Sequence, residues 1–100
     1  MFIGLGRYEL FLPTSVSLKD KRRVLRAVTM VVNKKFSVSI AEVDHQDLWQ
    51  RAALGVACVS GSMDHCHQVL DEVERTMEKV AIEGAEIVDR QRHFIALEDL

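Results

Sequence analysis

The sequence predicts an α+β fold, a single domain with the element order βαββαβ, and two kinds of pattern support it. Four short segments alternate apolar and polar residues, which is the period of a half-buried strand. Two longer segments repeat apolar residues every three to four positions, as amphipathic helices do. Two strand–helix–strand halves joined by a hairpin define the ferredoxin-like sandwich. Right-handed crossovers then give an antiparallel sheet of order 4-1-3-2 with both helices on one face.

The first predicted strand covers residues 2–12, where the side chains alternate between an apolar and a mixed face. Pro13 ends this strand, because proline has no N–H to donate to a neighbouring strand. Ser17 and Asp20 then form a helix start that resembles a capping box. The apolar spacing that follows predicts a helix over residues 18–35.

The two middle strands are predicted at residues 36–40 and 53–59. After the first of them the phase breaks, because Glu42 falls on the apolar side; a β-bulge or an early strand end would explain this. The second strand has a flat face of small residues that another backbone could approach closely, and we expect any dimer interface there. These small residues are Ala53, Gly55 and Ala57.

The last two elements are a helix with apolar residues at helical spacing from Cys66 to Val80 and a more polar strand over residues 86–97. A polar strand suits the edge of a sheet. Arg90 and Arg92 share one phase of this strand. We expect both of them near Arg7, on the sheet face that no helix covers.

Composition limits the class of protein. The chain has 100 residues, of which 48% are apolar, so one domain over residues 1–100 can build a core. A net charge of −2 argues against a general polyanion binder. Two cysteines without a CxxC pair are typical of reduced thiols in the cytoplasm. We see no signal peptide, no stretch that could span a membrane and no motif that calls for a cofactor.

Basic residues are concentrated in "SLKDKRRVLR", residues 17–26. Seven of the thirteen lysines and arginines lie on or just past the first helix, which indicates a contact with phosphates, as in RNA binding. The alternative is the solvated face of an ordinary amphipathic helix. The expected nucleic-acid contacts are Lys19, Lys21, Arg22, Arg23, Arg26 and, from the loop between the middle strands, Arg51.

That loop, "DHQDLWQR", is dense in polar groups. Asp44, His45 and Asp47 suit a metal or acid–base chemistry, but three donors on one short loop rarely complete a metal site. A right-handed crossover places the loop beside the start of the first helix. We therefore expect Asp44, His45 and Asp47 to brace the loop, with the two aspartates ordering Lys19, Arg22 or Arg23. We expect Trp49 to anchor it by packing on the end of the core rather than stacking on a ligand.

Two long motifs carry a resemblance. "LPTSVSLKDKRRVLR" and "SVSIAEVDHQDLWQRAALGVACVS" resemble the YlxP-like family, a bacterial domain family of unknown function. The resemblance implies a ferredoxin-like fold and no established activity. Members are often encoded beside translation-initiation and ribosome-maturation factors, which favours an RNA or ribosomal partner by association alone. The family usually opens its second helix with basic residues, whereas "GSMDHCHQ" has none here.

These patterns favour a small cytoplasmic protein without catalytic activity or cofactor, which binds RNA or a ribosomal surface through the first helix and the adjoining loop. One alternative is a homodimeric protein-interaction module. A third is a metal-dependent enzyme at the Asp44–Asp47 loop.

Overall fold

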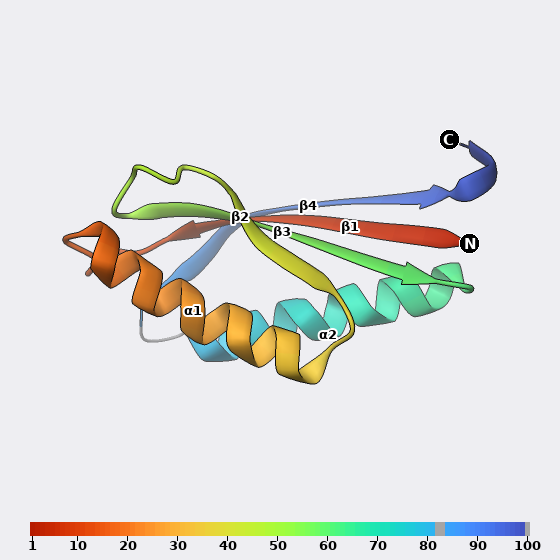
Figure 1. Ribbon diagram of the computed structural model, residues 1–100, viewed down its shortest axis with the longest axis horizontal. Coiled ribbons are helices and arrows are strands. Elements are labelled where there is room, and N and C mark those ends of the chain that lie inside the picture. The colour runs from red at the N-terminus through yellow and green to blue at the C-terminus, as the bar shows by residue number, and fades with distance from the viewer. Residues whose placement is uncertain (82–83, 100) are drawn as a thin grey trace.

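The computed structural model describes residues 1–81 and 84–99 and has the predicted element order, with two helices layered under one sheet (Figure 1). The prediction of one domain also covers residues 82, 83 and 100, which lie outside the described residues. All strand pairs are antiparallel, and the order β2-β3-β1-β4 is the predicted one. The elements are β1 (Phe2–Phe11), α1 (Leu18–Lys35), β2 (Ser39–Asp44), β3 (Arg51–Ser60), α2 (Met63–Ala81), β4 (Glu86–Ala96) and a short 3-10 helix, Leu97–Asp99.

The start of α1 follows from its capping residues. The backbone N–H of Asp20 donates to the Ser17 hydroxyl at 3.1 Å, and the Asp20 carboxylate accepts from the N–H of Val16 at 3.0 Å. These two bonds satisfy backbone donors that the first helical turn leaves free. The predicted start and end of this helix are both confirmed.

The core lies between the helices and the sheet, and it is built from the apolar faces that periodicity predicts. β1 and β3 supply the centre of the sheet side, and each helix supplies one stripe. The largest contributors are Tyr8, Leu10, Leu12, Leu54, Leu25, Val28, Val32, Leu70, Val73 and Met77. Cys58 and Cys66 are also buried, and both are free thiols, as predicted.

β2 contains a bulge, but the bulge does not account for the position of Glu42. The pairing of β2 with β3 shifts register between Glu42 and Asp44, which is after Glu42. Glu42 stays in phase with Ile40, opposite Leu54 on the core side of the sheet, and its carboxylate lies 2.8 Å from the Nζ of Lys21.

The expected position of Arg90 and Arg92 is wrong. Gln91, and neither arginine, is opposite Arg7 in the β1–β4 ladder. Both arginines point to the helix side, because a register shift beside Glu9 changes the phase of β4 relative to β1. There they form ion pairs with a row of carboxylates on α2, namely Asp71, Glu74 and Glu78.

Candidate functional site

Lys21 is the residue that joins α1 to the β2–β3 loop, residues 45–50. Its side chain is 1% exposed, although we predicted a solvated side chain that contacts phosphate. Its Nζ donates to the carbonyl oxygens of His45, Gln46 and Arg51 at 2.8, 3.2 and 3.3 Å, and it forms the ion pair with Glu42. The prediction that Lys21 is solvated is therefore wrong, and a buried ammonium cannot reach a ligand.

The pattern that reveals the burial of Lys21 is present in the sequence. Lys21 precedes Leu25, Val28 and Val32 at spacings of four, three and four, so it lies on the buried stripe of α1. Glu42 is likewise a charge on an apolar phase. Two charged residues, each on the buried side of its own element, neutralise one another across the helix–sheet interface.

The β2–β3 loop and the start of α1 lie at the same end of the domain, as the topology predicts (Figure 1). Two further bonds hold the loop against the chain that leaves β1. The N–H of Leu12 donates to the Gln50 carbonyl at 2.9 Å, and Gln50 Nε2 donates to the Pro13 carbonyl at 3.2 Å. His45 adopts a left-handed backbone conformation with φ 63°, which lets the chain turn sharply after β2.

The expected partners of the two loop aspartates are wrong. Asp44 pairs with Arg7 at 3.2 Å instead of a cation of α1, and it accepts the N–H of His45 at 2.8 Å. Within the described part of the chain, Asp47 has no basic partner within 4.0 Å. Arg23 pairs with Asp20 of its own helix at 3.3 Å. Backbone carbonyls and Glu42 hold the loop to α1, because they are the groups that surround the buried Lys21.

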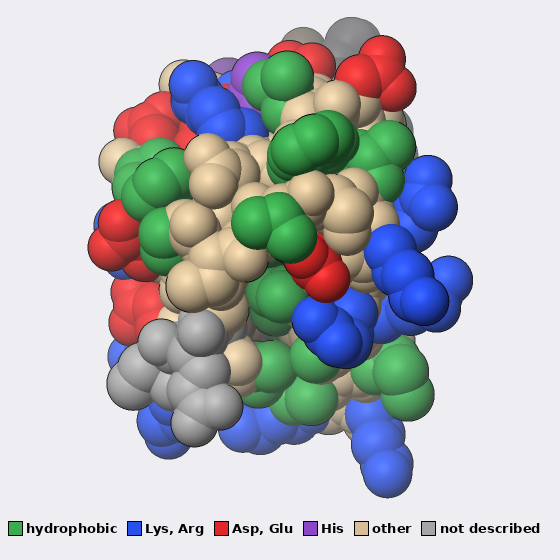
Figure 2. All heavy atoms as spheres, turned by 90° about the vertical axis from the view of Figure 1, so that its left-hand side faces the viewer, with side chains coloured by type: hydrophobic (Ala, Val, Ile, Leu, Met, Phe, Trp, Pro, Cys, Tyr) green, Lys and Arg blue, Asp and Glu red, His purple; other side chains and the backbone are tan. Residues whose placement is uncertain are grey.

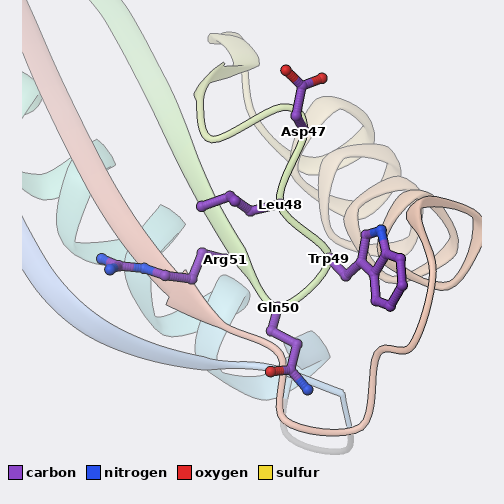
Figure 3. A pocket seen from close by; sticks show the side chains of 5 residues that line it. All are labelled: Asp47, Leu48, Trp49, Gln50 and Arg51. Carbon is purple, nitrogen blue, oxygen red and sulfur yellow. The ribbon is translucent and has the colours of Figure 1, made fainter.

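Trp49 does not pack on the core as expected, since its side chain is 54% exposed. The inner side of the loop is occupied by the backbone carbonyls of His45 and Gln46, which accept from the buried Lys21. A hollow of about 410 Å³ is lined by the consecutive residues Asp47, Leu48, Trp49, Gln50 and Arg51. Figure 3 shows the indole on the side of the loop next to the β1–α1 connection, whereas the Arg51 side chain extends away from it over the sheet.

The exposed cations of α1 form one continuous surface, here called the α1 basic face: Lys19, Arg22, Arg23 and Arg26, followed by Ala27 and Met30. With Asp20 these residues line a hollow of about 480 Å³. In residues 1–81 and 84–99, only Arg23 of the four cations has a carboxylate within 4.0 Å. Figure 2 shows lysine and arginine side chains gathered along one side of this end of the molecule.

Arg51 belongs to a separate cluster around Glu9, on the sheet face that the helices leave open. Glu9 is 8% exposed and receives hydrogen bonds from His45 Nε2 at 3.0 Å and Arg51 Nη2 at 3.3 Å, with Arg7 Nη1 at 2.9 Å. Burial raises the pKa of the Glu9 carboxyl, but His45, Arg7 and Arg51 together lower that pKa below its ordinary value. The six predicted cations are thus divided: four on the α1 basic face, one buried and one on the open face.

The open face of the sheet also contains the small residues of β3. Ala53 is fully buried, and Val43 of β2 lies over Gly55, because a Cβ built there would be 2.8 Å from Val43 Cγ1. The face is therefore less flat than the sequence suggests. A hollow of about 280 Å³ lies beside it, with the half-exposed side chains of Leu5 and Val43 and with Ala57 in its lining.

The described residues contain no group of three or more His, Cys, Asp or Glu side chains placed to hold a metal ion. The Asp44 and His45 side chains are instead bound to Arg7 and Glu9. No helix in residues 1–81 and 84–99 has the length and apolar character needed to cross a membrane.

Comparison with known proteins gives a family and a fold. The model of a family described as "Protein of unknown function (DUF503)" matches residues 3–92. "Uncharacterized protein YlxP" of Bacillus subtilis (strain 168) is 41% identical over 71 residues, which are 71% of this chain and 77% of that protein. Among solved structures, SnoaB, a cofactor-independent oxygenase from Streptomyces nogalater, has a TM-score of 0.54 at 4% identity and covers 95% and 91% of the two chains.

A second solved structure is a C-terminal segment of the alpha subunit of aIF2 from Pyrococcus abyssi, with a TM-score of 0.51 at 13% identity. The match covers 95% of this chain, which spans only 49% of that one. At such identities the two structures indicate a shared fold and nothing about activity.

Proposed function

This chain belongs to the DUF503 family of proteins of unknown function, and we propose that it binds structured RNA, free or on a ribosomal surface, through the α1 basic face. The observation that supports the proposal is a row of exposed cations, three of them without an acidic partner in the described residues, around one hollow. No catalytic step is part of the proposal.

Stability does not account for the α1 basic face. Lys19 and Arg22 lie in the first turns of the helix, where the positive end of the helix dipole disfavours cations. Acidic residues outnumber basic ones in the whole chain, fifteen to thirteen, so carboxylates were available to neutralise this surface. Unpaired cations at such a position are explained by a polyanion that binds there.

The spacing of the cations fits a nucleic-acid backbone. At a rise of about 1.5 Å per residue, Lys19 and Arg26 are roughly 10 Å apart along the helix axis. One strand of a DNA duplex carries a charge about every 3.4 Å along its axis, and on that scale this surface spans roughly three phosphates. Arginine also suits phosphate because its guanidinium can donate two parallel hydrogen bonds.

The test is a pair of matched double variants in titrations of a labelled hairpin RNA at several salt concentrations. Arg22→Ala with Arg26→Ala should weaken binding about tenfold or more at low salt, and should lower the slope of log affinity against log salt by about 1.4–1.8. The control is Arg75→Ala with Lys79→Ala, which removes two cations at the same spacing from α2.

The control variant should bind like the unmodified protein, and Lys21 stays intact in both. Equal losses in the two double variants would mean that only total charge matters. Absence of RNA binding by the unmodified protein at low salt would reject the proposal.

Self-association through the open sheet face is a second candidate. The exposed apolar side chains around the small-residue face are Leu5 of β1, Val43 of β2 and Val59 of β3 itself. A second copy would remove them from water. Gly55→Arg is a poor test, because its side chain would collide with Val43. Val43→Lys should instead convert a dimer to a monomer in sedimentation equilibrium, with the exposed loop residue changed in Val16→Lys as the control.

A further inference from the structure

We infer that Trp49 is a stacking platform for an unpaired base, so that the preferred ligand is RNA in which a single-stranded nucleotide adjoins a structured, phosphate-rich segment. This inference rests on the proposed function, because the α1 basic face supplies the phosphate contacts. It adds the β2–β3 loop to the binding surface and names the class of RNA.

The exposure of Trp49 is the first step. Tryptophan carries the largest apolar surface of any side chain, and burying it is strongly favourable. Here 54% of it is left in water, and its neighbour Leu48 is 47% exposed. Figure 3 shows the two side chains on opposite sides of the loop, with the indole on the side next to the β1–α1 connection. Proteins bind single-stranded nucleotides with exposed aromatic rings, on which bases stack, together with cationic surfaces that follow the backbone.

The loop that carries the indole is held firmly, which is the second step. Lys21 Nζ binds the carbonyl oxygens of His45 and Gln46, and the N–H of Leu12 binds that of Gln50, so three backbone positions of the loop are fixed. The Gln50 side chain is bound to the Pro13 carbonyl at 3.2 Å, and the N–H of Leu48 donates to the His45 carbonyl at 3.0 Å. A rigid loop that presents an apolar ring has little ordering entropy left to lose when a ligand binds.

Position relative to α1 is the third step. Lys21 lies between Asp20 and Arg22 in the chain, and its side chain ends under the loop. The cations of the α1 basic face lie on the other side of the helix from Lys21, but they belong to the turns of α1 that lie at the same end of the domain as the loop with the indole. In this inference, an RNA strand that the cations hold places an unpaired base against Trp49.

Fluorescence provides a direct test, because Trp49 is the one tryptophan in the chain. The probes are a hairpin RNA with an unpaired loop and a blunt duplex with the sequence of its stem. The hairpin should quench the emission of Trp49, and the duplex should leave it nearly unchanged. Labelled-RNA anisotropy should show Trp49→Leu weakening hairpin binding roughly 5- to 150-fold, the range expected for one lost stack.

Three comparisons sharpen the result. Trp49→Phe retains a ring and should keep part of the hairpin affinity, and Leu48→Ala should change it little. Duplex affinity should be the same in Trp49→Leu and in the unmodified protein. Because the side chain is half exposed, Trp49→Leu should unfold at the same urea concentration as the unmodified protein.

Two results would overturn the inference, and they are distinguishable. Hairpin binding that depends on Arg22 and Arg26 but neither quenches Trp49 nor weakens in Trp49→Leu would reject the stacking platform and leave the proposed function standing. Absence of binding to both RNAs at low salt would reject the proposed function and the platform together.

Discussion

Replacement of Lys21 by methionine is the perturbation that tests the helix–loop junction most directly. Methionine fills a similar volume and favours helix, so the change removes the ammonium and little else. The Nζ has four oxygen partners, at 2.8 Å from the Glu42 carboxylate and at 2.8, 3.2 and 3.3 Å from three backbone carbonyls. In the variant the three carbonyls lose their donor, and the Glu42 carboxylate loses its counter-ion.

The expected loss can be estimated from these contacts. Removal of one partner from a buried ion pair typically costs about 3–5 kcal/mol, because the other charge stays desolvated. The Glu42 side chain is 23% exposed and can reach water, which places the loss near the lower end, about 3 kcal/mol. For a domain of this size, that loss lowers Tm by roughly 12–24 °C.

Urea unfolding followed by far-UV circular dichroism at pH 7 measures this loss. Arg22→Met is the matched control, and it should change the free energy of unfolding by no more than about 0.5 kcal/mol because Arg22 is exposed. Adding Glu42→Leu to Lys21→Met should restore about 1–2 kcal/mol, since it removes the orphaned carboxylate. A loss below about 1 kcal/mol, or one equal to that of the control, would refute the reasoning.

Three further outcomes are expected. The cationic neighbours of Glu9 hold its pKa in the folded protein below the ordinary 4.5. The contribution of Glu9 to the free energy of unfolding is therefore full above pH 4.5, and it disappears as the pH falls through the lowered pKa of the folded state. Glu9→Gln should therefore flatten the acid limb of urea-derived stability below pH 4.5, and an unchanged limb would contradict this. Burial and the neighbouring thiol raise the pKa of Cys58 to about 11, so a thiol reagent at pH 8 should label the protein only after unfolding. Gly6→Ala should cost about 1–3 kcal/mol in thermal or urea unfolding, because its Cβ would be 2.7 Å from the Tyr8 ring. Gly61→Ala, with nothing within 4 Å, should be nearly neutral, and equal effects would argue against crowding as the cause.

The order and layers of this fold could be predicted because they depend on periodicity and chirality. The stripe on α1 and the Ser17 cap define that helix, and the alternation of β1 defines the central strand. The handedness of the crossovers then leaves one strand order. None of these steps requires knowledge of where an individual charged side chain ends.

The environment of single charges could be predicted only in part. A count of basic residues makes the run from Lys19 to Arg26 look like one cationic patch. Helical phase, however, places Lys21 on the buried side of α1 and its basic neighbours on the exposed side. The phases of Arg90 and Arg92 depend on a bulge that no local pattern marks, so the sequence could not place them. The exposure of Trp49 was unpredictable because it depends on which loop atoms Lys21 binds.

The position of β1 at the centre of the sheet has a consequence for synthesis of the chain. β1 is synthesised before the other strands of this sheet, yet its two neighbours are β3, which begins at Arg51, and β4, whose Ala96 pairs with Phe2. The nascent strand therefore waits for both of its partners with its amide groups unpaired. Long-range pairing of this kind gives a high contact order and slow folding. Until β3 is complete, β1 is the segment most in need of a chaperone to prevent aggregation.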